Sequence, residues 1–103
     1  MHVLLQVDFP YHGPFGDEMT QAMDVLSASI NQEPGFIWKI WTENKETQKA
    51  GGIYLFDSKE NAQAYLDKHS ARLKSFGIPE VRGDIFSVNQ ALSLKNQASF
   101  LAK

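Results

Sequence analysis

The sequence predicts an α+β domain in which strands and helices follow one another in the order β-α-β-β-α-β. Three observations support this fold class. Four segments contain apolar residues at alternating positions or in short β-rich runs, two longer segments contain them at three- and four-residue steps, and glycine or proline separates most of these segments.

The first predicted strand covers residues 2–9, in which every second residue is apolar. The face that these residues form consists of Val3, Leu5, Val7 and Phe9. Two prolines and two glycines within residues 10–16 then end the strand. We expect one continuous helix from Asp17, whose charge suits a helix N-terminus, to the stop at Pro34-Gly35. Its apolar face carries Met19, Ala22, Met23, Leu26 and Ile30.

Residues 36–43 form the second predicted strand, and residues 50–57 return antiparallel to it after a hairpin loop at residues 44–49. Strict alternation in the second strand places Phe36, Trp38 and Ile40 on one side and Ile37, Lys39 and Trp41 on the other. In the third strand, Ile53 and Leu55 oppose Tyr54 and Phe56. Because both sides of these strands are largely apolar, we expect both faces of the sheet to be covered.

Ser58 is predicted to cap a second helix, which Gly77 ends just before Pro79. The inward stripe of this helix consists of Ala62, Tyr65, Leu66, His69, Leu73 and Phe76. Residues 80–88 give the fourth strand, which completes a ferredoxin-like unit with both helices on one face of an antiparallel sheet. We expect one domain over residues 1–103, with residues 89–103 as a C-terminal extension that packs on the domain or on a partner subunit.

The second face of the sheet predicts a homodimer. Two helices cover only one side of four strands, yet apolar side chains occupy both sides. A second copy of the same sheet is the simplest cover for the other side. Since such a seam should be densely packed, we expect the ligand pocket within each protomer, between the helices and the sheet.

Composition excludes several classes of function. A net charge of −2, from 12 acidic and 10 basic residues, gives no electrostatic signal for nucleic acid or an anionic membrane. The absence of cysteine excludes disulfides, iron–sulfur clusters, thiolate zinc sites and cysteine nucleophiles. No segment has the length and apolarity of a membrane-spanning helix, and residues 1–8 lack the features of a signal peptide. We therefore expect a cytoplasmic protein.

Several motifs occur in order along the chain: GPFG at residues 13–16, INQEPGF at 30–36, WTE at 41–43, AGGIYLF at 50–56 and YLDKH at 65–69. Together with Trp38, they resemble the YdhR-type monooxygenase family over roughly residues 3–97. The resemblance implies the dimeric α+β barrel superfamily, in which two ferredoxin-like sheets pack face to face. Some members of that superfamily oxidise aromatic polyketides with dioxygen and without flavin, haem or metal. The resemblance therefore implies an oxidoreductase that needs no cofactor and acts on an aromatic or quinol-like small molecule.

Such chemistry requires particular groups. Dioxygen has a triplet ground state and reacts slowly with closed-shell organic molecules, so the substrate itself must become an electron-rich anion. The protein then supplies an aromatic pocket, a proton acceptor and donors that hold the oxyanion. His69 is the candidate catalytic residue, as proton acceptor or oxyanion partner, because an imidazole titrates near neutrality and burial on the inward stripe should lower its pKa and keep it neutral. The alternative is a core histidine bonded to a backbone carbonyl.

Six residues are candidates for substrate binding: Trp38, Trp41, Tyr54, Tyr65, Arg72 and His12. The aromatic residues offer flat walls, Arg72 could neutralise an oxyanion, and His12 lies in a Pro/Gly loop suited to a pocket mouth. Arg72 and His12 are alternatively solvated surface residues. Because the two tryptophans face opposite sides of their strand, we expect one of them to belong to a dimer core. Lys39 shares a face with Trp41 and either pairs with a substrate anion or covers apolar surface with its stem.

Two further functions stay open. Some relatives in the superfamily bind or degrade haem, and they have a tryptophan near the end of the third strand and a histidine on the following helix. Those positions fall nearest Phe56 and Tyr65 here, and His69 lies one helical turn further on. A non-catalytic dimeric binder of a hydrophobic metabolite is the other alternative. No set of carboxylates and histidines has metal-ligand spacing, so we expect no metal site.

Overall fold

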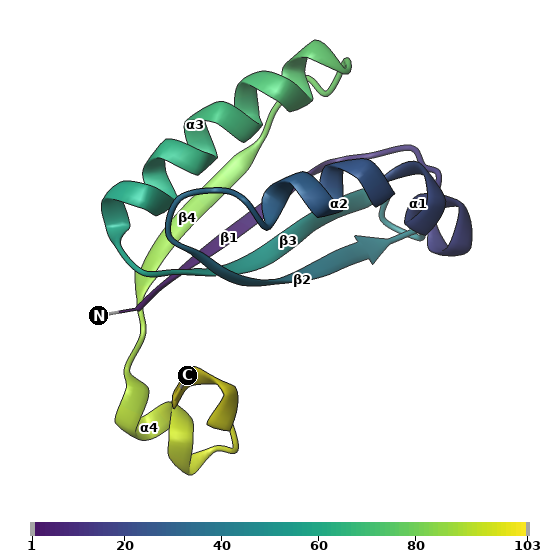
Figure 1. Ribbon diagram of the computed structural model, residues 1–103. Coiled ribbons are helices and arrows are strands. Elements are labelled where there is room, and N and C mark those ends of the chain that lie inside the picture. The colour runs from purple at the N-terminus through teal and green to yellow at the C-terminus, as the bar shows by residue number, and fades with distance from the viewer. Residues whose placement is uncertain (1, 103) are drawn as a thin grey trace.

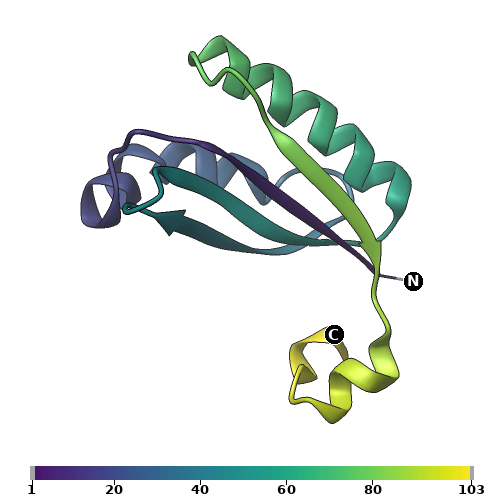
Figure 2. The same ribbon diagram turned by 180° about the vertical axis from the view of Figure 1, so that it is seen from behind.

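The computed structural model describes residues 2–102 and confirms the predicted ferredoxin-like α+β architecture (Figure 1). The strands are β1 (Val3–Pro10), β2 (Phe36–Asn44), β3 (Lys49–Phe56) and β4 (Arg82–Ser87). They form one antiparallel sheet in the order β2-β3-β1-β4. The helices are α1 (Gly16–Ala22), α2 (Asp24–Ile30), α3 (Lys59–Ser75) and α4 (Gln90–Lys95), followed by the 3₁₀ turn η1 (Ser99–Ala102). Figures 1 and 2 show α1, α2 and α3 on one side of the sheet and the C-terminal segment on the other.

The helix-covered face of the sheet carries the core, and its register follows the predicted alternation. Val3 lies opposite Phe56, and Leu5 lies between Tyr54 on β3 and Ile85 on β4. Paired residues of antiparallel strands point to the same face, so these side chains form one surface beneath the helices. The buried core cluster consists of Val3, Leu5, Val7, Ile30, Tyr54, Phe56, Ala62 and Tyr65.

A β-bulge corrects the predicted alternation at the start of β2. The register shifts between Phe36 and Trp38, so that Phe36 pairs with Phe56 on the helix-covered face instead of sharing the opposite face with Trp38. The gain is an edge-to-face contact between the Phe36 and Phe56 rings, whose centroids lie 6.0 Å apart. Beyond the bulge the predicted alternation holds, with Lys39 and Trp41 on the helix-covered face and Ile40 on the other.

The predicted continuous helix is instead two helices, α1 and α2, joined at Met23. The backbone of Met23 leaves helical geometry, with φ −100° and ψ 7°. Hydrogen bonds from Met23 N to Met19 O (2.9 Å) and from Ser27 N to Met23 O (2.8 Å) span the joint, so the change is a local kink. The apolar spacing of the segment is unaffected by this kink, which explains why the sequence pattern does not reveal it.

The ends of α3 follow the prediction. The Ser58 side chain accepts a hydrogen bond from the Asn61 amide at 3.2 Å, as an N-cap does, and Gly77 adopts a positive φ of 91° after the last turn. Phe76, which was expected on the inward stripe, is instead 67% exposed. The stripe ends at Leu73 because Phe76 is the C-cap residue, where the backbone leaves the helix.

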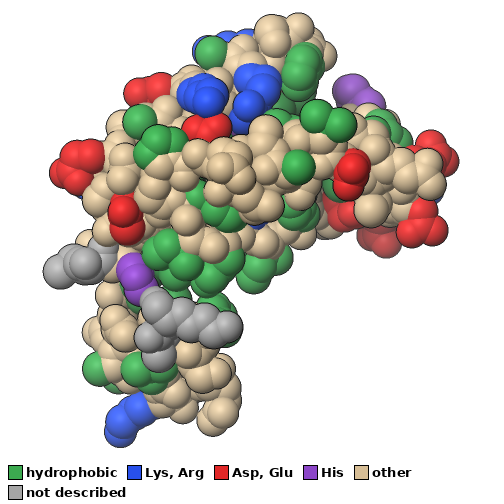
Figure 3. Space-filling model, in the orientation of Figure 1, with side chains coloured by type: hydrophobic (Ala, Val, Ile, Leu, Met, Phe, Trp, Pro, Cys, Tyr) green, Lys and Arg blue, Asp and Glu red, His purple; other side chains and the backbone are tan. Residues whose placement is uncertain are grey.

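The other face of the sheet is not covered by α1, α2 or α3. Ile40 and Phe86 lie there, and about half of the surface of each residue is exposed (51% and 50%). The C-terminal segment lies below this face, and Phe100 packs edge-to-face on Trp38 with 5.3 Å between ring centroids. Figure 3 shows hydrophobic side chains gathered along the edge next to this segment. Among residues 2–102, no helix combines the length and apolarity needed to cross a bilayer.

Candidate functional site

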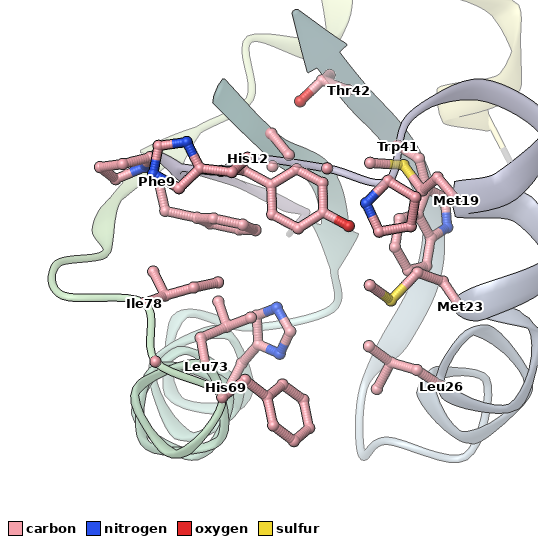
Figure 4. A pocket seen from close by; sticks show the side chains of 18 of the residues that line it. Phe9, His12, Met19, Met23, Leu26, Trp41, Thr42, His69, Leu73 and Ile78 are labelled. Carbon is pink, nitrogen blue, oxygen red and sulfur yellow. The ribbon is translucent and has the colours of Figure 1, made fainter. Parts of the chain in front are cut away.

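A cavity of about 630 Å³ lies between the helices and the sheet, where a pocket was predicted. Figure 4 shows Met19, Met23 and Leu26 on one wall, facing His69 and Leu73 of α3 on the other. The sheet supplies the floor, which includes Trp41 and Lys39 of β2. Loop residues at either end, His12 among them, complete the lining. A volume of this size, with mostly apolar walls and few polar groups, is typical of a site for a small organic molecule.

Lys39 places an amine against aromatic rings on the floor of the cavity. Its Nζ lies 3.3 Å from the Trp41 ring centroid and 4.7 Å from that of Tyr54. Gly52 of β3, which pairs with Trp41, makes room for this side chain, since a Cβ there would lie 2.6 Å from Lys39 Cε. Burial lowers the pKa of Lys39 from 10.5 to about 7, assisted by the positive charge of Arg72.

His69 and Arg72 form a pair one turn apart on α3. Arg72 Nη2 donates a hydrogen bond to His69 Nδ1 at 2.8 Å, and the Tyr65 ring stacks on the imidazole at 5.1 Å. Because an arginine only donates, Nδ1 must be the acceptor, which assigns the ring proton to Nε2. Burial, aided by the charges of Lys39 and Arg72, lowers the pKa of His69 to about 3. The imidazole is therefore neutral at pH 7, as expected, and its bond partner is Arg72 rather than a backbone carbonyl.

Tyr54 and Tyr65 lie beneath the site as a buried pair. Their hydroxyl oxygens are 3.1 Å apart, and the two residues are 1% and 2% exposed. Burial raises the pKa of both hydroxyls, so neither is a base near neutral pH. Neither tyrosine is among the cavity-lining residues. Their rings support Lys39 and His69 from below rather than facing the cavity directly.

The remaining predicted site residues divide between the two faces of the sheet. Trp41 and His12 line the cavity, and His12 Nδ1 lies 3.0 Å from Gln48 Oε1. Trp38 does not, because the register turns it to the opposite face, where it contacts Phe100. Arg72 is partly buried behind His69, and its Nε has no hydrogen-bond partner among the described residues.

Lys39 is a functional candidate that sequence reasoning left outside the predicted set of site residues. A lysine on an edge strand is ordinarily solvated. The sequence features that indicate an inward-facing Lys39 are its shared face with Trp41 and the Gly51-Gly52 pair on the adjoining strand. No acidic side chain is among the residues that line the cavity. Within residues 2–102 there is also no cluster of three His, Cys, Asp or Glu side chains arranged to hold a metal ion.

Solved structures similar to this one are oxygenases by their descriptions. SnoaB from Streptomyces nogalater, described as a cofactor-independent oxygenase, superposes with a TM-score of 0.60 at 15% identity and covers 85% of this chain and 93% of its own. A putative antibiotic biosynthesis monooxygenase from Deinococcus radiodurans gives 0.56 at 11% identity, over 86% and 93% of the two chains. A protein with the same description from Chloroflexus aurantiacus J-10-fl gives 0.51 at 16% identity, over 86% and 95%. At these identities the likeness shows the fold.

Sequence comparison shows the family. No curated protein is similar enough in sequence to count as a relative. A family model, described as "Putative mono-oxygenase ydhR", matches residues 4–99. This match covers nearly the whole chain and agrees with the motifs read from the sequence, so the chain belongs to the YdhR mono-oxygenase family.

Proposed function

We propose that this protein is a monooxygenase that oxidises a small phenol- or quinol-like aromatic molecule with dioxygen, without flavin, haem or metal. The observation that carries the proposal is the cavity, in which apolar and aromatic walls surround the nitrogens of Lys39 and His69. Membership of the YdhR mono-oxygenase family supports the reaction class. The described cofactor independence of the structurally similar SnoaB supports the absence of a prosthetic group.

The reaction balances without an external reductant. Loss of the phenolic proton gives an anion that can pass one electron to dioxygen, after which the two radicals combine. A ring CH₂ that becomes C=O takes one oxygen atom, and the other oxygen atom leaves as water. The substrate supplies all the electrons, so the protein has to bind, deprotonate and shield it.

His69 fits the role of hydrogen-bond donor to the oxyanion. Its Nδ1 lone pair is occupied by Arg72, which leaves the Nε2 hydrogen for another partner. A donor of this kind, fixed by Tyr65 and Arg72, stabilises negative charge that develops on a substrate oxygen. The proton itself must then go to another acceptor, because protonation of His69 is opposed by burial and by two neighbouring positive groups.

Haem binding fits these residues poorly. Phe56 and Tyr65, which fall nearest the positions used by haem-binding relatives of the superfamily, are buried in the core and line no part of the cavity. Ligation of iron through His69 Nε2 would require the ring proton on Nδ1, which faces the Arg72 donor. The hydrogen bond would have to break before the histidine could serve as a ligand.

Oxygen consumption tests the proposal. With 1,8-dihydroxyanthrone, a fused-ring phenol with an oxidisable CH₂, we expect oxygen uptake and quinone formation above the rate without protein. Replacing His69 by leucine should lower kcat about 10²–10³-fold, as loss of an oxyanion donor does. His2→Leu, outside the cavity, is the matched control. Saturable binding without oxygen uptake would instead establish the non-catalytic binder, and a shifted Soret band on adding haem would establish the haem alternative.

A further inference from the structure

We propose that the Lys39 amine accepts the proton of an aromatic hydroxyl, and that the cavity holds its ligand as the phenolate beside the resulting ammonium. This inference rests on the proposed function, because it names the acceptor that the reaction requires. It also stands apart from oxidation, since proton transfer within a bound complex needs no dioxygen.

The Lys39 amine lies where a ligand in the cavity would meet it. Lys39 Nζ lies over the Trp41 ring at 3.3 Å and lines the cavity, so an aromatic ligand that packs against this part of the floor meets the nitrogen. Gly52 keeps the space under the lysine stem open. The side chain is therefore held in one place by rings and backbone instead of extending into solvent.

The charged and titratable groups around the amine are the second reason for the proposal. On α3 it faces Arg72 and His69, on β3 the hydroxyl-bearing ring of Tyr54, and across the cavity the apolar side chains of α1 and α2. The nearest acidic residue along β2 on the same face is Glu43, whose Oε1 accepts a hydrogen bond from the Gly16 amide at 2.8 Å. Lys39 thus has a cationic neighbour and no carboxylate partner lining the cavity.

An amine in these surroundings can accept a proton from the ligand and pair with the anion that results. Burial and Arg72 together lower the pKa of Lys39 to about 7, so a large fraction of the amine is neutral at that pH and has a lone pair available. When a phenol binds, its O–H bond breaks, the electron pair stays on oxygen and the proton forms an N–H bond at Nζ. The product is an ammonium–phenolate ion pair, in which attraction to the ligand offsets the repulsion from Arg72. No oxidant or reductant enters this step.

Binding of 2-naphthol under anaerobic conditions at pH 8 tests the inference. Free 2-naphthol is mostly un-ionised at that pH, and its absorption band moves to longer wavelength when it ionises. We expect the wild-type complex to show the naphtholate band with no proton released into a weakly buffered solution. Lys39→Met should reduce the ratio of naphtholate to naphthol in the bound ligand by at least ~10-fold, equivalent to one pKa unit. Lys45→Met, in the exposed β2–β3 turn, should behave as wild type.

Three results would overturn the inference. The first is a wild-type complex with the spectrum of un-ionised naphthol, or no saturable binding. The second is release of the ligand's proton to solution on binding to the wild type, which would mean that the amine is not the acceptor. The third is an undiminished naphtholate band in Lys39→Met. Because the measurement excludes dioxygen, naphtholate binding without oxygen uptake in the separate assay would retain the proton acceptor and reject only the oxygenase.

Discussion

The burial of Lys39 predicts an unusual dependence of stability on pH. Its pKa is 10.5 in ordinary surroundings and about 7 in the folded protein, so the unfolded chain binds this proton more tightly. Below pH 7 the amine is charged in both states, and its burial opposes folding in full. Between pH 7 and 10.5 the folded state has released the proton while the unfolded state retains it, so the free energy of unfolding rises with pH.

The size of the effect follows from the two pKa values. The difference between 10.5 and about 7 corresponds to about 5 kcal/mol over the whole range, at ~1.4 kcal/mol for each pKa unit. Ionisation of tyrosines in the unfolded chain begins to matter near pH 10, so the clean window ends near pH 9. Between pH 7 and 9 we expect a rise of roughly 2 kcal/mol, a sizeable part of the ~5–15 kcal/mol that stabilises a typical domain.

Urea unfolding followed by tryptophan fluorescence measures this rise. The wild type and Lys39→Met should be compared from pH 6 to 9 at one fixed protein concentration, because association would couple stability to concentration. Methionine keeps an unbranched chain of similar length without an ionisable group. The free energy of the wild type should climb relative to the variant by roughly 2 kcal/mol between pH 7 and 9. Parallel curves would refute the reasoning, because they would mean that the amine is charged and solvated in the native protein.

Two further predictions concern the floor of the cavity and the uncovered face of the sheet. Gly52→Ala places a Cβ 2.6 Å from Lys39 Cε, so it should displace the amine. Titration with 2-naphthol should then show binding at least ~10-fold weaker, while the circular dichroism spectrum stays native. Unchanged affinity would mean that the amine does not contact the ligand. We also propose that the helix-free face forms a homodimer, so Ile40→Lys, at a position 51% exposed on that face, should give monomers in sedimentation velocity at micromolar concentration. Val25→Lys, 81% exposed on α2, is the control that should keep the wild-type oligomeric state, and a folded wild-type monomer would contradict the proposed dimer.

The sequence predicted the fold well because each element carries a local signal. Alternation in residues 2–9 determines which side of β1 is buried, and the observed register agrees with it. Ser58 and Gly77 act through their own backbone surroundings, so both ends of α3 could be placed from neighbouring residues alone. Where no such signal exists the prediction fails. The bulge after Phe36 and the kink at Met23 are local changes of backbone geometry, which a periodic pattern of apolar residues does not record.

The candidate site was less predictable because its chemistry depends on partners from different elements. His69 was recognisable from the stripe of one helix, and Arg72 from its three-residue spacing. The direction of their hydrogen bond, which assigns the proton of the imidazole to Nε2, depends on side-chain conformations that no spacing encodes. Two roles were expected of His69, proton acceptor and oxyanion partner, and our proposal keeps the second, with the Nε2 hydrogen as the donor to the oxyanion.

The burial of Lys39 could not be predicted from its own strand, because it depends on residues of β3 and α3. On β2 alone it is an edge-strand lysine, whose stem would cover apolar surface while the amine stays in water. In the folded chain, α3 lies over the same face with Arg72 and His69, and Gly52 on β3 leaves room for the stem to cross toward Tyr54. The burial that costs stability when the cavity is empty is the same burial that makes the amine neutral and basic near pH 7. An anionic ligand would offset that cost by pairing with the Lys39 ammonium. The free energy of unfolding should therefore increase when the bound ligand carries a negative charge.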